Sequence, residues 1–342
     1  MALTLVVAAC GDDGAEGTTG TDPSTSTTVP APSTTAGTTT TFEAEAIPDD
    51  APDDAPDDAA DAARVIEHAR GTAEVPGEPS RIVVLDSGIT YDSLVALGLG
   101  EAIVARGRQG VDAFWTSVDP EPIELVGEGA ELNLEAIAAA RPDLIIGTVF
   151  NVGEAYDELA QIAPTVALAV SDEATFSYGD WRPLLISTAA AVGRPDEADE
   201  LIAEFDAARD AALASIELDG RTVAVVSLLG ERVFVSDERT LQTDVLRDLG
   251  FELNAGIPPG TVEISLEQLS LLDAADELVV LEFGPGGDDE ARAALTALPT
   301  ASSVDAIVDG SVVVVDGFLW GNAGPLGQRL VLEEIAADLL AR

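Results

Sequence analysis

The sequence contains no lysine, and it has one cysteine, one histidine and one methionine among its 342 residues. The single cysteine, Cys10, excludes both an internal disulfide and a cluster of cysteine ligands around a metal. The single histidine, His68, excludes a zinc or manganese site made of several histidines, and it precedes the first clear strand. A Ser–His or Cys–His catalytic pair is therefore not expected. We expect a protein that is not an enzyme, with no resident cofactor and no metal site of its own.

Positive charge is also scarce, because 16 arginines face 63 acidic residues and the formal net charge is −47. A field of this sign repels the phosphates of nucleic acids and of anionic membranes, so no nucleic-acid partner is expected. A GC-rich genome and a salty habitat are sufficient to produce an acidic, lysine-free surface. The bulk charge therefore says little about a ligand, whereas the positions of the few arginines are informative.

The first ten residues are apolar and end in Val7-Ala8-Ala9-Cys10. This pattern resembles the end of a bacterial lipoprotein signal, in which the cysteine thiol accepts the lipid. Positive charge and a longer apolar stretch would normally come first, so we interpret residues 1–10 as a truncated signal whose true translation start lies upstream. The prediction is lipidation of Cys10 and anchoring to the outer face of the cell membrane.

Residues 11–61 are rich in Thr, Ser, Pro, Ala and Asp and contain Asp-Asp-Ala-Pro repeats. Such a composition cannot offset the entropy of the chain by burying apolar surface. We predict a disordered tether between the anchor and the folded region.

The remaining residues show short apolar runs followed by helical patterns, which indicates an α/β protein with largely parallel sheets. In residues 62–180 this repeat predicts an N-terminal α/β lobe. Its expected strands are 81–85, 102–105, 143–147 and 165–170, and its expected helices are 91–97, 134–140 with Asn133 as N-cap, and 155–162.

Residues 181–217 form the predicted connecting region, in which Pro195 begins a helix of about 22 residues and about 33 Å. A C-terminal α/β lobe is predicted for residues 218–342. Its expected elements are strands at 223–228, 233–235, 277–281 and 312–315, and helices at 241–249, 266–271, 291–297 and 327–340. Two Rossmann-like lobes joined by one long helix predict a ligand cleft at the carboxyl ends of the strands.

Five segments resemble, in order, the iron-siderophore and cobalamin type of periplasmic binding protein, also called the helical-backbone metal-receptor group. They are Gly71–Leu85, Leu94–Gly98, the segment Leu132-Asn-Leu-Glu-Ala-Ile-Ala-Ala-Ala-Arg-Pro-Asp-Leu-Ile-Ile146, Ile162–Val166 and Ile264–Leu269. The third is the most specific, since it is similar to the family's "NLE…L.PDLII" pattern. The resemblance implies a monomeric substrate-binding subunit that captures a ferric siderophore or similar chelate. It also implies delivery of that cargo to an ABC permease driven by its ATPase.

The resemblance further implies that one acidic residue on each lobe docks on arginines of the permease. The matching positions are Glu135, in Asn133-Leu-Glu-Ala, and Glu267, in Ser265-Leu-Glu-Gln. Both glutamates are also expected in the first turn of a helix, where a carboxylate is favourable in any case. Docking and helix stabilisation are compatible roles.

A ferric siderophore is large and often anionic, so its site needs arginine forks and aromatic walls. The residues of these types that fall at predicted strand ends or in nearby loops are the candidate ligand contacts. They are Arg106, Arg108, Trp115, Tyr178, Trp181, Arg182, Arg232, Phe283 and Trp320. Each of them could instead pack within its loop.

Two alternatives remain within the same fold. Cobalamin is neutral overall and does not need arginines, whereas haem usually needs a His or Tyr ligand, for which Tyr178 is the nearest residue. Outside transport, a hydrolase-like lipoprotein or a surface adhesion or signalling module could reuse the fold.

Overall fold

The computed structural model describes residues 62–86, 88–107, 124–127, 131–170, 180–214, 218, 220–236, 240–284 and 286–340. The chain divides into two compact units, residues 1–55 and 56–342, and every described residue lies in the second. Among the described residues no helix combines the length and the apolar character needed to cross a membrane.

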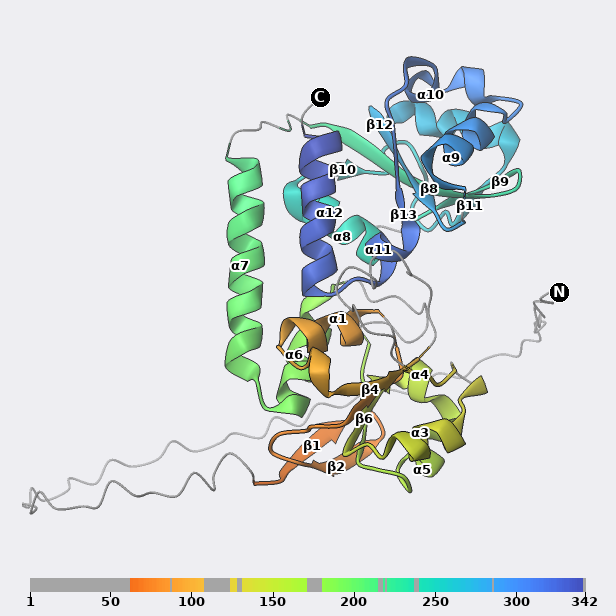
Figure 1. Ribbon diagram of the computed structural model, residues 1–342. Helices are drawn as coiled ribbons and strands as arrows, with labels where there is room; N and C mark the ends of the chain where they lie inside the picture. Colours follow the sequence, from red (N-terminus) through yellow and green to blue (C-terminus); the bar gives the residue numbers. More distant parts are fainter. Residues whose placement is uncertain are drawn as a thin grey trace, which may run out of the picture. The chain divides into compact units, whose positions relative to one another are not determined.

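The first lobe begins with an antiparallel hairpin and continues as a five-stranded parallel sheet (Figure 1). The strand order β5-β4-β3-β6-β7 places the earliest strand of the sheet at its centre. Strands β4 and β5 are added on one side of β3, and strands β6 and β7 on the other. Open α/β sheets bind ligands beside the strand at which this order of addition reverses. The elements are β1 (Arg64–His68), β2 (Gly71–Val75), β3 (Ile82–Val84), α1 (Ile89–Ala96), η2 (Gly100–Ala102), β4 (Ile103–Arg106), β5 (Glu124–Leu125), α3 (Leu134–Ala140), β6 (Leu144–Thr148), α4 (Val149–Val152), η4 (Gly153–Ala155), α5 (Tyr156–Leu159) and β7 (Thr165–Leu168).

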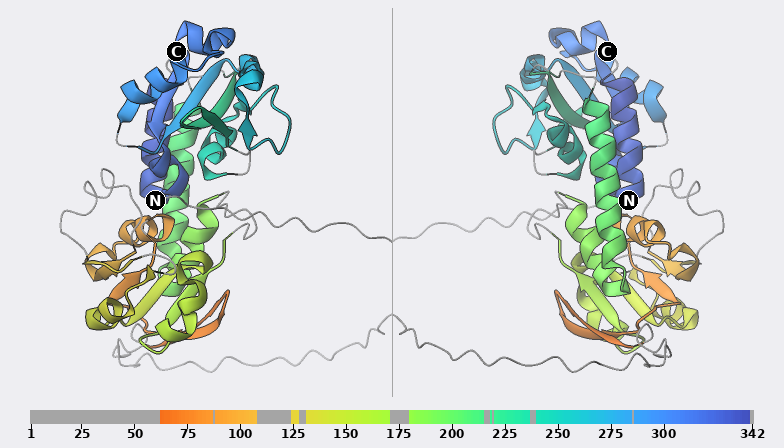
Figure 2. Two further views of the ribbon diagram at one scale, coloured as in Figure 1. Left: turned by 90° about the vertical axis from the view of Figure 1, so that its right-hand side faces the viewer. Right: turned by 90° about the vertical axis from the view of Figure 1, so that its left-hand side faces the viewer.

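Two helices lead to the second lobe, α6 (Arg182–Val192) and α7 (Pro195–Leu213). Gly193 ends α6 with a left-handed backbone conformation at φ 77°. Pro195 occupies the first turn of α7, as predicted. The 19 residues of α7 span about 28 Å, less than the predicted length. Figure 2 shows α7 running alongside α12 (Pro325–Asp338).

The second lobe contains a six-stranded sheet with the order β11-β9-β8-β12-β13 and with β10 paired to β8. Strands β8, β12 and β13 are parallel, whereas β8 and β9 form a hairpin. The elements are β8 (Thr222–Leu229), β9 (Arg232–Val235), α8 (Leu241–Leu249), β10 (Glu252–Leu253), β11 (Glu263–Ile264), η5 (Leu266–Ala274), β12 (Glu277–Glu282), α9 (Gly287–Thr296), η6 (Ala301–Ser303), α10 (Asp305–Asp309), β13 (Val312–Asp316), α11 (Gly317–Asn322) and α12.

One apolar core extends through both lobes and the connecting helices. It contains Tyr91 and Leu94 from the first lobe, Phe205 from α7, and Trp320 and Leu332 from the second lobe. Because these side chains are packed into one buried cluster, the lobes are joined by a shared core as well as by α7.

The predicted fold class is confirmed. As expected for an N-cap, the Asn133 side chain accepts a hydrogen bond from the Ala136 N–H. At the start of η5, Ser265 and Gln268 form a capping box. The helix expected at 266–271 is present as a 3-10 helix, η5, and Arg232 is the first residue of β9. The proposed boundaries of the tether and the lobes stay predictions.

Candidate ligand-binding site

In each lobe, the segments that follow the C-terminal ends of the parallel strands are here called the carboxyl edge. The two lobes meet through these carboxyl edges. Helix α1 follows β3 in the first lobe, and α11 follows β13 in the second, where it lies on the side toward α1 (Figure 1). A Cβ atom added to Gly88, the N-cap of α1, would lie 2.9 Å from the Asn322 carbonyl oxygen at the end of α11. This close approach requires a glycine, and it brings the two carboxyl edges into contact.

A buried carboxylate fixes this junction. Asp92 on α1 accepts hydrogen bonds from the Leu326 N–H at 3.0 Å and the Gly327 N–H at 2.9 Å, so it caps the first turn of α12. Burial raises the pKa of Asp92 to about 7, although these backbone hydrogen bonds favour the anion. A side chain at position 327 would collide with Ala323, which explains the glycine there.

The first lobe contributes polar groups at its carboxyl edge. Asp86 follows β3 and is buried, and its Oδ1 accepts hydrogen bonds from the Gly88 N–H at 2.9 Å and the Thr90 N–H at 3.2 Å. Burial raises the pKa of its carboxyl group. Arg106, the last residue of β4, is half-buried, and its guanidinium lies 5.7 Å from the centre of the Tyr91 ring. A cation therefore stands at the strand end where the sequence predicted it.

The second lobe contributes aromatic rings. Phe283 directly follows β12 and is 42% exposed, and Phe318 lies in the first turn of α11. The two rings meet edge to face, with their centres 5.1 Å apart. The sequence indicated Phe283 but missed Phe318, because Trp320 in the same helix is the more conspicuous aromatic.

Trp320 is buried in the core, and its indole N–H donates a hydrogen bond to Glu334 at 2.8 Å. Burial raises the pKa of Glu334, and the hydrogen bond from Trp320 lowers it by a smaller amount. The Trp320 side chain therefore packs and forms its hydrogen bond inside the second lobe. This position gives no support to the predicted contact between Trp320 and a ligand.

Trp181 and Arg182 occupy the connecting region. Trp181 is buried against Phe205, with the ring centres 5.2 Å apart. The Arg182 guanidinium contacts carboxylates of Asp180 at 3.2 Å, Asp206 at 3.1 Å and Asp248 at 3.4 Å. Burial opposes its charge, but these carboxylates raise its pKa overall. Arg182 thus joins α6 and α7 to α8, a structural role in place of the expected ligand contact.

Arg232 is exposed at the β8–β9 hairpin, and its Nε donates to Glu263 at 2.9 Å. This pair links β9 to β11 on the sheet surface, so Arg232 also departs from the expected ligand contact. Arg108, Trp115, Tyr178 and Cys10 lie outside the described residues.

The two proposed docking glutamates occupy equivalent positions. Glu135 is the second residue of α3, which follows β5, the outermost strand of the first sheet. Glu267 is the second residue of η5, which follows β11, the outermost strand of the second sheet. Strand β11 runs parallel to β8, because both are antiparallel to β9. Both glutamates are exposed and lie at the carboxyl edge of their lobe.

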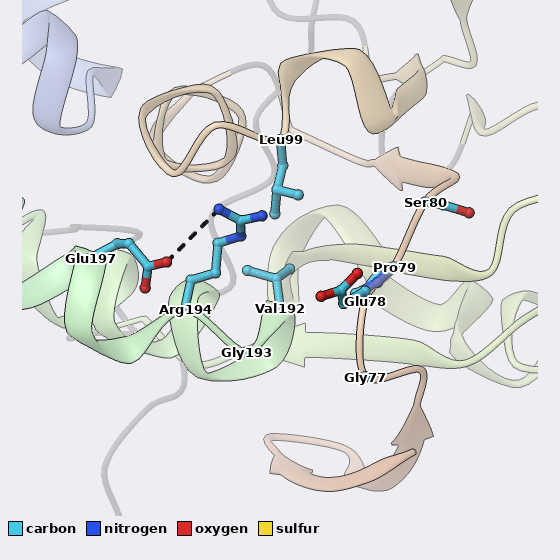
Figure 3. A pocket seen from close by; sticks show the side chains of 9 residues that line it. All are labelled: Gly77, Glu78, Pro79, Ser80, Leu99, Val192, Gly193, Arg194 and Glu197. Carbon is cyan, nitrogen blue, oxygen red and sulfur yellow. Dashed lines mark ion pairs between the residues drawn. The ribbon is translucent and has the colours of Figure 1, made fainter. Parts of the chain in front are cut away.

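A hollow of about 400 Å³ lies between the first lobe and the start of α7. Figure 3 shows the side chains that line it. The hollow is lined by the loop Gly77–Ser80, which precedes β3, and by the start of α7, where Arg194 pairs with Glu197 at 3.8 Å. The hollow therefore lies at the opposite edge from Arg106 and Phe283. No group of three or more potential metal ligands occurs among the described residues.

Comparison with known proteins gives consistent matches. A family model described as "Periplasmic binding protein" matches residues 82–317. The probable siderophore-binding lipoprotein YfiY of Bacillus subtilis is 35% identical over 194 residues, which cover 55% of this chain and 57% of that protein. The chain thus aligns with little more than half of that relative's length.

Two further matches cover more of the chain. The Fe(3+)-citrate-binding protein YfmC of Bacillus subtilis is 27% identical over 75% of this chain and 80% of that protein. The crystal structure of a periplasmic solute binding protein from Mycobacterium smegmatis superposes with a TM-score of 0.69 at 25% identity. That superposition covers 82% of this chain and 98% of the other.

Proposed function

The chain belongs to the periplasmic binding protein family, and from that premise we propose that it is the substrate-binding subunit of an ABC importer for a ferric siderophore or similar chelate. The similarity to a siderophore-binding lipoprotein and to an Fe(3+)-citrate-binding protein supports this cargo. The family is one of binding proteins, which agrees with the expectation that the chain is not an enzyme.

The observation that carries the proposal is the meeting of two carboxyl edges at the α1–α11 junction. Each edge follows parallel strands, which is where α/β sheets bind ligands. The first lobe presents a cation there, Arg106, and the second presents the rings of Phe283 and Phe318. A large chelate with anionic and apolar parts fits this combination of groups.

Arg106→Gln is expected to weaken binding of an anionic ferric siderophore by about tenfold, because one charge-assisted contact contributes about 1.5 kcal/mol. Affinity is measured by titrating tryptophan fluorescence with a panel of ferric siderophores. Neutral cobalamin serves as a comparison ligand, and its binding should not respond to the change. Arg194→Gln, in the hollow at the opposite edge, is the matched control. Equal affinity of wild type and Arg106→Gln for every chelate would move the assignment toward a neutral ligand.

We also propose that the protein is held at the outer face of the cell membrane by a lipid on Cys10. Val7-Ala8-Ala9-Cys10 and the polar segment that follows support this proposal, as does the lipoprotein name of one relative. Expressed with its full upstream start, the wild type should incorporate a radiolabelled lipid precursor, and Cys10→Ser should not. Labelling of both to the same extent would show that Cys10 is not the anchor.

A further inference from the structure

Phe283 and Phe318 are brought together by the second sheet. Strands β12 and β13 pair in parallel with Glu282 opposite Asp316, so the residues that follow them emerge side by side. Phe283 comes one residue after Glu282, and Phe318 two residues after Asp316. Their edge-to-face contact, with an interplanar angle of 89°, is a favourable geometry for an aromatic pair.

The backbone holds the exposed ring in place. A Cβ atom at Gly317 would lie 2.6 Å from atoms of the Phe283 ring, so this ring rests directly on the glycine backbone. Phe283 nevertheless leaves 42% of its surface exposed at the edge that faces the first lobe. A large apolar ring that is fixed but uncovered at such an edge is a ready surface for an apolar group of a ligand.

Carboxylate residues come just before the two phenylalanines, Glu282 before Phe283 and Asp316 before Phe318, and backbone hydrogen bonds fix both carboxylates. Asp316 Oδ1 accepts from the Phe318 N–H at 2.8 Å and the Leu319 N–H at 3.0 Å. Glu282 accepts from the Gly284 N–H. The face of an aromatic ring is itself electronegative. This surface therefore disfavours a ligand whose outer groups are carboxylates.

The arginines among the described residues of the second lobe are engaged with other groups of the protein. Within the described part of residues 220–340, each arginine already contacts a protein carboxylate or carbonyl. The pairs are Arg221 with Glu277, Arg232 with Glu263, Arg247 with Asp244, Arg292 with the Val312 carbonyl, and Arg329 with Glu204.

We propose that Phe283 and Phe318 form an aromatic subsite that receives an aryl group of the cargo. The substrate class is then a ferric chelate with aromatic rings, of the catecholate type, and ferric citrate is a poor ligand. This inference rests on the proposed function and narrows it. Arg106 on the first lobe and the rings on the second contact different parts of one ligand, which separates charge recognition from aryl recognition.

The test compares two anionic probes, a synthetic ferric tris(catecholate) complex and ferric citrate, by isothermal titration calorimetry. Wild-type protein should bind the tris(catecholate) at least tenfold more tightly. Phe283→Ala should weaken tris(catecholate) binding by about tenfold, a typical effect of losing one aromatic contact with the surface that it buries. Binding of ferric citrate should change less than twofold. Phe318→Leu keeps an apolar side chain in the fold and should show the same selective loss.

Val308→Ala is the matched control, because Val308 is an exposed apolar residue on α10, outside the carboxyl edge. It should leave both affinities unchanged. Equal losses for both probes in Phe283→Ala, or a wild type that prefers ferric citrate, would overturn the aromatic subsite while leaving the importer function in place. Failure of the wild type to bind any ferric chelate would overturn the proposed function itself.

Discussion

In wild type, but not in Asp92→Asn, the free energy of unfolding is expected to fall by roughly 3 kcal/mol between pH 5 and pH 8 through one carboxyl group. Asp92 has no exposed surface, and its carboxylate lies against the backbone of Leu326 and Gly327. Burial raises its pKa from 3.8 to about 7 in the folded chain. An asparagine of the same shape cannot titrate, so it removes this pH dependence.

The direction of the effect follows from proton binding. Between pH 4 and pH 7 the folded state retains a proton on Asp92 that the unfolded state has lost. Stability from this group is therefore complete below the unfolded pKa, declines as pH rises, and is lost above the folded pKa of about 7. The difference between wild type and variant isolates this group from the many other carboxylates of a chain with net charge −47.

The measurement is urea unfolding at four pH values from 5 to 8, for wild type and variant. Asp276→Asn is the control, because backbone and side-chain hydrogen bonds from Thr222 lower the pKa of Asp276 below its usual range. Its stability contribution is lost only as pH falls through that lowered value, so between pH 5 and 8 this variant should parallel wild type. Parallel curves for Asp92→Asn and wild type would show that Asp92 titrates normally.

The sequence was informative wherever a signal is local. Apolar runs predicted the buried central strands of both sheets, and short-range signals predicted the Asn133 N-cap and the helix start at Pro195. The sequence did not predict the two-residue strands β5, β10 and β11, because two residues are too few to show a periodic pattern.

The junction between the lobes could not be read in the same way. Asp92 resembles any polar residue of a short helix, and its partners lie 234 and 235 residues further along the chain. The aromatic pair shows a related limit. Both Phe318 and Trp320 follow β13, but only the helical phase of α11 decides that Trp320 points into the core while Phe318 meets Phe283. Pattern alone predicts where such residues cluster and not which of them turn inward.

The double change Glu135→Ala and Glu267→Ala is expected to reduce uptake of cargo at least tenfold in cells while leaving cargo affinity within about twofold. The reason is geometric. Both glutamates stand second in a helical segment that follows the outermost strand of its sheet, so one flat partner can engage both lobes at their carboxyl edges. Glu135 lies on α3 and Glu267 on η5, whereas Arg106 ends β4 and the phenylalanine pair follows β12 and β13.

Charge pairs across such an interface guide encounter and fix orientation. We expect each glutamate to meet an arginine of the permease, and loss of two exposed pairs at about 0.7 kcal/mol each corresponds to about tenfold. The glutamates also favour their own helix termini, so stability must be measured in parallel. Glu135→Gln and Glu267→Gln keep the side-chain length and remove only the charge.

The control for charge is Glu158→Ala with Asp309→Ala, which removes two exposed carboxylates from α5 and α10, the helices that precede β7 and β13. It should leave uptake unchanged. Since docking depends on sign as well as position, Glu135→Arg with Glu267→Arg should abolish uptake more completely than the alanine pair. Normal uptake by the alanine pair, with folding and cargo affinity intact, would place the permease contact elsewhere on the protein.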